Sequence, residues 1–218
     1  INLVRSENNY TAITGVENDG GIVILNGTKI TGEATEGQIC HYIGTTTIHN
    51  VTATGATENC PESVWYGANG TLTINGGTFN KIVVDSGNYG GVKSVAELLG
   101  EGYACKKQDG TWATADELAA MEISNVTVKE IPLTIQPQGD TSWYYGSPHT
   151  LEMNAAPVNG RDSITYVWKN GNETLGYTSD ACTVPADTPV GSYTYTCEAT
   201  CDGYTLSHTF TFKIEKSG

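Results

Sequence analysis

Two pairs of adjacent aromatic residues are the side chains of this sequence best suited to contact a ligand. Trp65-Tyr66 lies in an expected loop that follows Cys60, and Trp143-Tyr144 precedes the alternating strands of the second half. Aromatic faces pack against the C–H faces of sugar rings, so these pairs predict a shallow glycan-binding platform. The alternative is structural: Trp65 would cover the core of the first half, and Trp143 would pack at the junction between the halves.

Groups that could catalyse glycan cleavage are sparse. Hydrolysis of a glycosidic bond uses two carboxylates roughly 5 to 10 Å apart, but the acidic residues of the first half fall in expected loops. These residues are Glu33, Glu36, Glu58 and Glu62. We therefore expect a non-catalytic chain, and the alternatives are the C-terminal part of a polysaccharide-degrading enzyme or a purely structural stalk.

The histidines and cysteines form no metal-binding pattern. The six cysteines include no Cys-X-X-Cys pair, and neither His41 nor His49 has a partner at ligand spacing. Cys182, Cys197 and His208 could come together, but a structural zinc site needs a fourth ligand, so we expect these residues to fill a protein interior. We predict no metal and no cofactor.

Composition narrows the class of partner. Eleven basic residues against 24 acidic ones give a net charge of −13 over 218 residues, which would repel the phosphate backbone of nucleic acids. No segment reaches the about 20 apolar residues of a membrane-spanning helix, so we expect no membrane insertion. Abundant glycine and few charged residues (16%) are typical of a secreted β-protein. We expect a monomer. Because the sequence begins at Ile1, without methionine or a signal-peptide pattern, we also expect it to be a piece of a longer protein.

A short pattern repeated at a nearly constant interval organises the first half. Strand-like residues with a shared asparagine recur at Asn26, Asn50 and Asn75, which are 24 and 25 residues apart. This interval is the size of one coil of a parallel β-solenoid, whose repeats bury their apolar faces by stacking on one another. We predict that the three asparagines form a ladder of side-chain amides. The alternative is three ordinary asparagine turns.

From about residue 92 the pattern changes to a small α/β element that would close the end of this stack. Residues 94–97 predict a short helix that begins with a capping box, and residues 114–117 open a second short helix that runs through Met121. Residues 103–113 predict a hairpin that turns at Asp109-Gly110. We place this cap at about residues 92–131, within a first domain of residues 1–131.

From residue 132 the sequence alternates between apolar and polar residues, as in half-buried strands. Residues 193–200 and 204–214 alternate most regularly, and Asp202-Gly203 joins them as a two-residue type I′ hairpin. This register predicts that Cys197 lies opposite His208.

This second half, residues 132–218, resembles a bacterial immunoglobulin-like domain. Trp168 matches the core tryptophan of the third strand, and Gly191-Ser192-Tyr193 matches the tyrosine corner. No cysteine lies between residue 132 and Trp168, so the inter-sheet disulfide of antibody domains cannot form. The resemblance leaves Cys182 to pair with Cys197 or Cys201, and Cys197 is preferred.

The whole sequence resembles the large modular surface proteins of Gram-positive gut bacteria. The resemblance rests on the repeats, on the segment Gly-Tyr-Ala-Cys-Lys-Lys-Gln-Asp-Gly-Thr-Trp at 102–112, and on Tyr-Thr-Cys-Glu-Ala-Thr-Cys-Asp-Gly-Tyr at 195–204. It implies an all-β chain: a right-handed parallel β-helix with a small α/β cap, followed by an immunoglobulin-like β-sandwich. It also implies an extracellular place on the bacterial cell surface and a role in adhesion or glycan binding, with a glycan or a host surface protein as partner.

Overall fold

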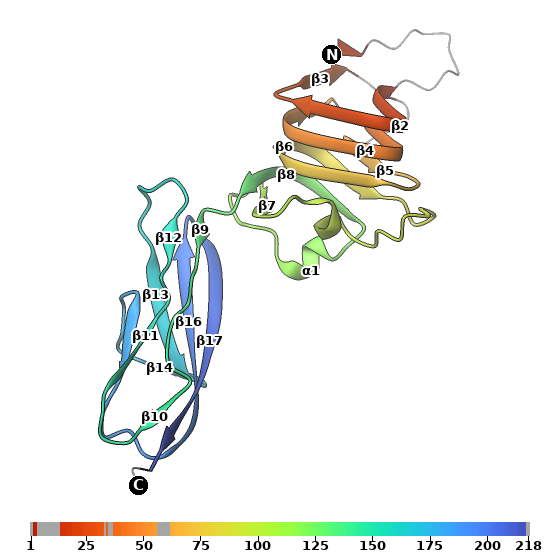
Figure 1. The fold of residues 1–218 in the computed structure, drawn as a ribbon. Coiled ribbons are helices and arrows are strands. Elements are labelled where there is room, and N and C mark those ends of the chain that lie inside the picture. Colours follow the sequence, from red (N-terminus) through yellow and green to blue (C-terminus); the bar gives the residue numbers. More distant parts are fainter. Residues whose placement is uncertain (1, 4–13, 33, 35–36, 56–61, 217–218) are drawn as a thin grey trace. The chain divides into compact units, whose positions relative to one another are not determined.

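A computed structural model describes residues 2–3, 14–32, 34, 37–55 and 62–216. The chain is mostly β structure and divides into two compact units, residues 1–130 and residues 131–218 (Figure 1). The division lies one residue before the boundary placed from the sequence. Each unit has a hydrophobic core of its own.

The described part of the first unit forms one mixed sheet of eight strands. In chain order these strands are β1 (Asn2–Leu3), β2 (Thr14–Asn26), β3 (Lys29–Gly32), β4 (Gly37–Ala53), β5 (Val64–Tyr66), β6 (Thr71–Val84), β7 (Tyr103–Lys107) and β8 (Glu122–Glu130). Pairings among β1 to β6 are parallel, whereas β8 runs antiparallel to both β6 and β7. In Figure 1, β2, β4 and β6 lie one beyond the other, and β8 follows.

Successive passes of the chain, residues 14–32, 37–53 and 64–84, pair in parallel. Ile24 pairs with Thr47, and Thr47 pairs with Thr73. More residues therefore separate paired positions of the second and third passes than paired positions of the first and second. The register also aligns apolar side chains from pass to pass. Three such columns are Leu25, Ile48 and Ile74; Ile30, Ala53 and Phe79; and Ile39, Val64 and Ile82. All but Leu25 are at most 1% exposed, and burial of each large aliphatic side chain contributes about 1.5–3 kcal/mol.

The predicted ladder of Asn26, Asn50 and Asn75 is wrong. Asn26 pairs with His49 and His49 pairs with Asn75, so Asn50 lies one position further along its strand. The error arises because paired positions of the first and second passes are separated by fewer residues than those of the second and third. An alignment of the passes on their asparagines therefore shifts the middle pass by one position from its observed register. Asn50 occupies a corner instead, with a left-handed backbone at φ 48°.

Left-handed corners are the feature that recurs from pass to pass. One column of corners contains Gly27, Asn50 and Gly76, and the other contains Gly21, Gly44 and Gly70, all with positive φ. Glycine and asparagine tolerate this conformation better than other residues. A Cβ at Gly44 would lie 2.4 Å from the carbonyl oxygen of Gly21, and one at Gly70 would lie 2.2 Å from that of Gly44. Glycine at these corners therefore lets neighbouring passes approach closely.

Two short helices follow β6. The α-helix α1 (Ala115–Leu118) begins with a capping box that was not predicted: Glu117 N donates to Thr114 Oγ1 at 3.2 Å, and Thr114 N donates to Glu117 Oε2 at 2.7 Å. The other helix, η1 (Val95–Leu98), is a single 3₁₀ turn in which the Ser94 side chain caps no backbone N–H. The capping box predicted there is therefore wrong.

Strand β8 was not predicted, although it pairs with both β6 and β7. The predicted hairpin at Asp109-Gly110 is present as a short turn. Lys107 N donates to Thr111 O at 2.8 Å, and Lys106 forms a bridge with Trp112. The β7 strand thus contacts β8 along one edge and this turn near its end.

The described part of the second unit contains nine strands in three sheets. They are β9 (Leu133–Thr134), β10 (Ser142–Tyr144), β11 (His149–Glu152), β12 (Ala156–Pro157), β13 (Thr165–Asn170), β14 (Glu173–Thr174), β15 (Ala181–Val184), β16 (Gly191–Cys201) and β17 (Tyr204–Glu215). The largest sheet has the order β10-β17-β16-β13-β14, and the two small sheets pair β11 with β15 and β12 with β9.

The long hairpin of the second unit has the predicted register. Asp202 and Gly203 turn with φ values of 46° and 72°, and Cys197 pairs with His208. The core residue Trp168 is fully buried and donates its indole N–H to Ser179 O at 3.0 Å. The Tyr193 hydroxyl donates to Pro189 O at 2.7 Å.

The preferred disulfide between Cys182 and Cys197 is not formed. Both residues are free thiols with no exposed surface, and Cys201 is also a buried free thiol. Cys182 pairs with Leu151 in one sheet and Cys197 with Trp168 in another, so each thiol packs as a small apolar side chain. Burial raises the pKa of Cys182 to about 11 and that of Cys197 to about 12.

Candidate functional site

The aromatic pair of the first unit does not form a platform. Trp65 and Tyr66 lie in strand β5 rather than in a loop, so their side chains point to opposite faces. Tyr66 is fully buried, stacks on His41 at 5.3 Å, and donates its hydroxyl to Gly70 O at 3.0 Å. Burial raises the pKa of this phenol. Tyr66 is therefore a core residue.

Trp65 is half-buried. Its ring meets Tyr42 edge-on at 5.0 Å, and a Cβ at Gly67 would lie 1.9 Å from the ring, so the indole lies over the backbone of Gly67. One side of the ring is thus covered by the chain. Contact of the other side with a glycan stays a prediction.

The second aromatic pair is divided in the same way by the alternation of a strand. Trp143 is 7% exposed and stacks on His149 at 4.3 Å and on Phe212 at 4.7 Å, within the core of the second unit. Its predicted role in a platform is therefore wrong. Tyr144, the next residue, is 62% exposed and remains able to contact a ligand.

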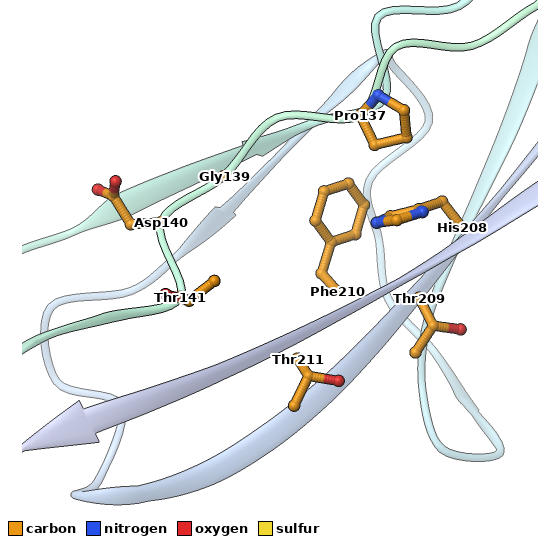
Figure 2. Close-up of a pocket in the computed structure, with 8 residues that line it drawn as sticks. All are labelled: Pro137, Gly139, Asp140, Thr141, His208, Thr209, Phe210 and Thr211. Atoms are coloured by element: carbon orange, nitrogen blue, oxygen red, sulfur yellow. The ribbon is translucent and has the colours of Figure 1, made fainter.

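A pocket of about 230 Å³ lies in the second unit, beside strand β17 (Figure 2). It is lined by Pro137, Gly139, Asp140, Thr141, His208, Thr209, Phe210 and Thr211. Figure 2 shows the rings of Pro137, Phe210 and His208 gathered together, with Asp140 and Thr141 farther along the same segment. The His208 ring meets Phe210 edge-on at 4.6 Å. The pocket therefore combines apolar ring surfaces with hydroxyl and carboxylate groups.

The pocket opens because the segment before β10 changes partners. At Gln138 this segment exchanges two 2.8 Å backbone hydrogen bonds with Glu152 of β11, and at Ser142 it pairs with Lys213 of β17. Between these points the segment diverges from β17. A Cβ at Gly139 would lie 2.7 Å from the Leu151 side chain, so glycine allows the chain to pass close to the core here.

Backbone groups of β17 also face the pocket. Lys213 N donates to Thr141 O at 2.9 Å, so the backbone polar groups of Lys213 point towards the segment before β10. Alternate residues of a strand share this direction, so the N–H and C=O groups of Thr209 and Thr211 point the same way. Within the described chain, β10 pairs with β17 only at residues 213–215. The edge at Thr209 and Thr211 therefore offers donors and acceptors to a ligand.

Asp140 supplies the one carboxylate among the residues that line this pocket. Its Oδ2 lies 3.1 Å from His149 Nδ1, and the His149 ring is itself held by stacking on Trp143. Asp140 therefore offers a ligand one acceptor group in this pocket.

The remaining candidate residues take structural positions. His41 is fully buried, with Nε2 2.8 Å from Asn69 O and Nδ1 2.8 Å from Thr46 Oγ1. Burial lowers its pKa. His49 is half-buried and pairs with Asn26 and Asn75 on the neighbouring strands. Nowhere in the described chain do three His, Cys, Asp or Glu side chains gather as metal ligands would. Among the described residues, no helix has the length and apolar character needed to cross a membrane.

Comparison with known protein families finds none that matches this chain, and a search of curated proteins finds no relative. The site is therefore defined by geometry alone. Sequence reasoning missed it because its two walls, residues 137–141 and 208–211, are distant in the chain. The signal in the sequence was His208, a polar residue within an otherwise apolar stripe of an alternating strand.

Proposed function

We propose that this chain is a non-catalytic, extracellular glycan-binding module of a bacterial surface protein. The observation that carries the proposal is the pocket beside β17, which joins the Pro137, Phe210 and His208 rings to polar groups of Asp140 and Thr141. Sugar-binding sites combine these features, because sugar rings have apolar C–H faces and polar hydroxyl edges.

The fold class that we propose agrees with this role. Parallel pairing of three successive passes supports an interpretation of the first unit as the end of a parallel β-helix, closed by β7, β8 and the short helices. The buried Trp168 and the Tyr193 hydrogen bond support an immunoglobulin-like interpretation of the second unit. Modules of both kinds would serve a rigid protein on the bacterial cell surface, whose partner is a glycan or a glycosylated host protein.

A glycan array probed with the full chain tests this function. Wild-type protein is expected to bind a subset of glycans, and His208→Ala should weaken that binding at least tenfold by removing one ring from the pocket. Ser207→Ala is the matched control, because Ser207 is also exposed on β17 but does not line the pocket. The proposal fails if no glycan is retained, or if the two variants bind as well as each other.

A further inference from the structure

A second hollow, of about 310 Å³, lies in the first unit over β4, β6, β7 and β8. Its floor contains Gly76 and Gly77, which contribute no side chains. A Cβ at Gly77 would lie 2.2 Å from Val51 O, and one at Gly76 would lie 2.5 Å from Asn50 Oδ1. A side chain at Gly77 would collide with the backbone of the preceding pass, so glycine leaves this part of the floor without a side chain.

A row of hydroxyl groups lines the hollow. Thr52 pairs with Thr78, and Thr78 pairs with Thr127, so three threonines occupy one row across three neighbouring strands. Neighbouring strands are about 4.8 Å apart, so the hydroxyls recur at a spacing comparable to the length of a sugar ring. The Thr78 and Thr127 Oγ1 atoms are 3.3 Å apart. Each hydroxyl both donates and accepts hydrogen bonds, as the hydroxyls of a sugar do.

The charge at this hollow differs from that of the whole chain. Lys129 lies two residues beyond Thr127 on β8, on the same face, and its side chain is exposed. None of the lining residues is acidic, although the chain carries a net charge of −13. The ammonium group of Lys129 therefore provides a local site for a negative group that most of this protein would repel.

We propose that this hollow binds an acidic sugar residue. The sugar carboxylate pairs with Lys129, and the ring hydroxyls bond to the row Thr52, Thr78 and Thr127. The exposed side-chain amide of Asn50 also lines the hollow, next to Gly76. This site does not rest on the pocket of the second unit.

Calorimetric titration of the full chain with a glucuronate-containing tetrasaccharide tests the proposal. A carboxyl-reduced form of the same tetrasaccharide serves as the neutral probe. Wild-type protein is expected to bind the acidic form at least tenfold more tightly than the reduced form, and Lys129→Gln should abolish this difference. Thr78→Val, which keeps the shape of the side chain but removes its hydroxyl, should weaken both forms.

Two controls distinguish this site from a general effect of charge and from the pocket of the second unit. Lys93→Gln makes the same charge change at an exposed residue outside the hollow, and His208→Ala disables the pocket of the second unit; both should bind the acidic probe as wild type does. The proposal is overturned if the acidic and reduced forms bind equally, if Lys129→Gln has no effect, or if sodium acetate at equal concentration displaces the tetrasaccharide. Loss of binding in His208→Ala would assign the ligand to the second unit and also overturn it.

Discussion

Buried His41 connects the stability of the first unit to pH through a chain of hydrogen bonds. The carbonyl oxygen of Asn69 can only accept, so Nε2 of His41 carries the hydrogen, and Nδ1 accepts from the Thr46 hydroxyl. The Thr46 oxygen in turn accepts from Asn18 Nδ2 at 3.0 Å. Every group is satisfied when the imidazole is neutral. A proton on Nδ1 would take away its acceptor role and place a charge in the core.

We therefore predict that acid destabilises this unit through His41. Burial holds the pKa of folded His41 below its ordinary value of 6.5, so the unfolded chain takes up the proton first. The free energy of unfolding should fall as the pH drops below 6.5, by up to about 1.4 kcal/mol for each pH unit, and level off below the folded pKa. An NMR titration of the His41 ring measures that pKa directly. A value at or above 6.5 would contradict the assignment.

At the scale of elements, the corner glycines determine how closely the passes of the first unit stack. Gly21 and Gly44 occupy the same column, with φ values of 106° and 95°. They differ in what lies beside them: a Cβ at Gly44 would strike the backbone of Gly21, whereas a Cβ at Gly21 would meet no described atom within 4 Å. The two positions therefore separate backbone strain from the contact between passes.

We predict that Gly44→Ala is much more destabilising than Gly21→Ala. Both substitutions introduce the backbone strain of a positive φ, about 1–3 kcal/mol, but only Gly44→Ala also forces two passes apart. Urea unfolding of the two variants should reveal a free-energy difference of at least about 1 kcal/mol, and Gly70→Ala should behave like Gly44→Ala. Equal losses for Gly21→Ala and Gly44→Ala would rule out close stacking as the reason for glycine.

Local chemistry determines which elements could be predicted from the sequence. The hairpin at Asp202-Gly203 was predicted in register because turn residues and alternation specify it within one short stretch of the chain. Strand β8 was missed because its partners β6 and β7 pair with it over long loops. The corner register was missed because Gly27, Asn50 and Gly76 share a conformation rather than a residue type. The pocket was missed because distant segments form it.

At the scale of the whole molecule, each unit contains its own core, built around the fully buried Phe79 and Tyr66 in one and Trp168 in the other. Such units are expected to fold independently. We predict that residues 131–218, expressed alone, unfold cooperatively in urea, with fluorescence that shows Trp143 and Trp168 to be buried and a midpoint that matches one transition of the full chain. A fragment without near-ultraviolet circular dichroism would show that the second unit needs residues 1–130.

If the chain is a glycan-binding module, the pocket beside β17 holds the glycan. An NMR titration of the ¹⁵N-labelled full chain with the glycan that binds best on an array locates the binding site, because the amides of Thr209 and Thr211 face the pocket. We expect the largest chemical-shift changes to cluster at residues 139–141 and 208–211. Changes confined to residues around Trp65, or no changes at saturating glycan, would contradict it.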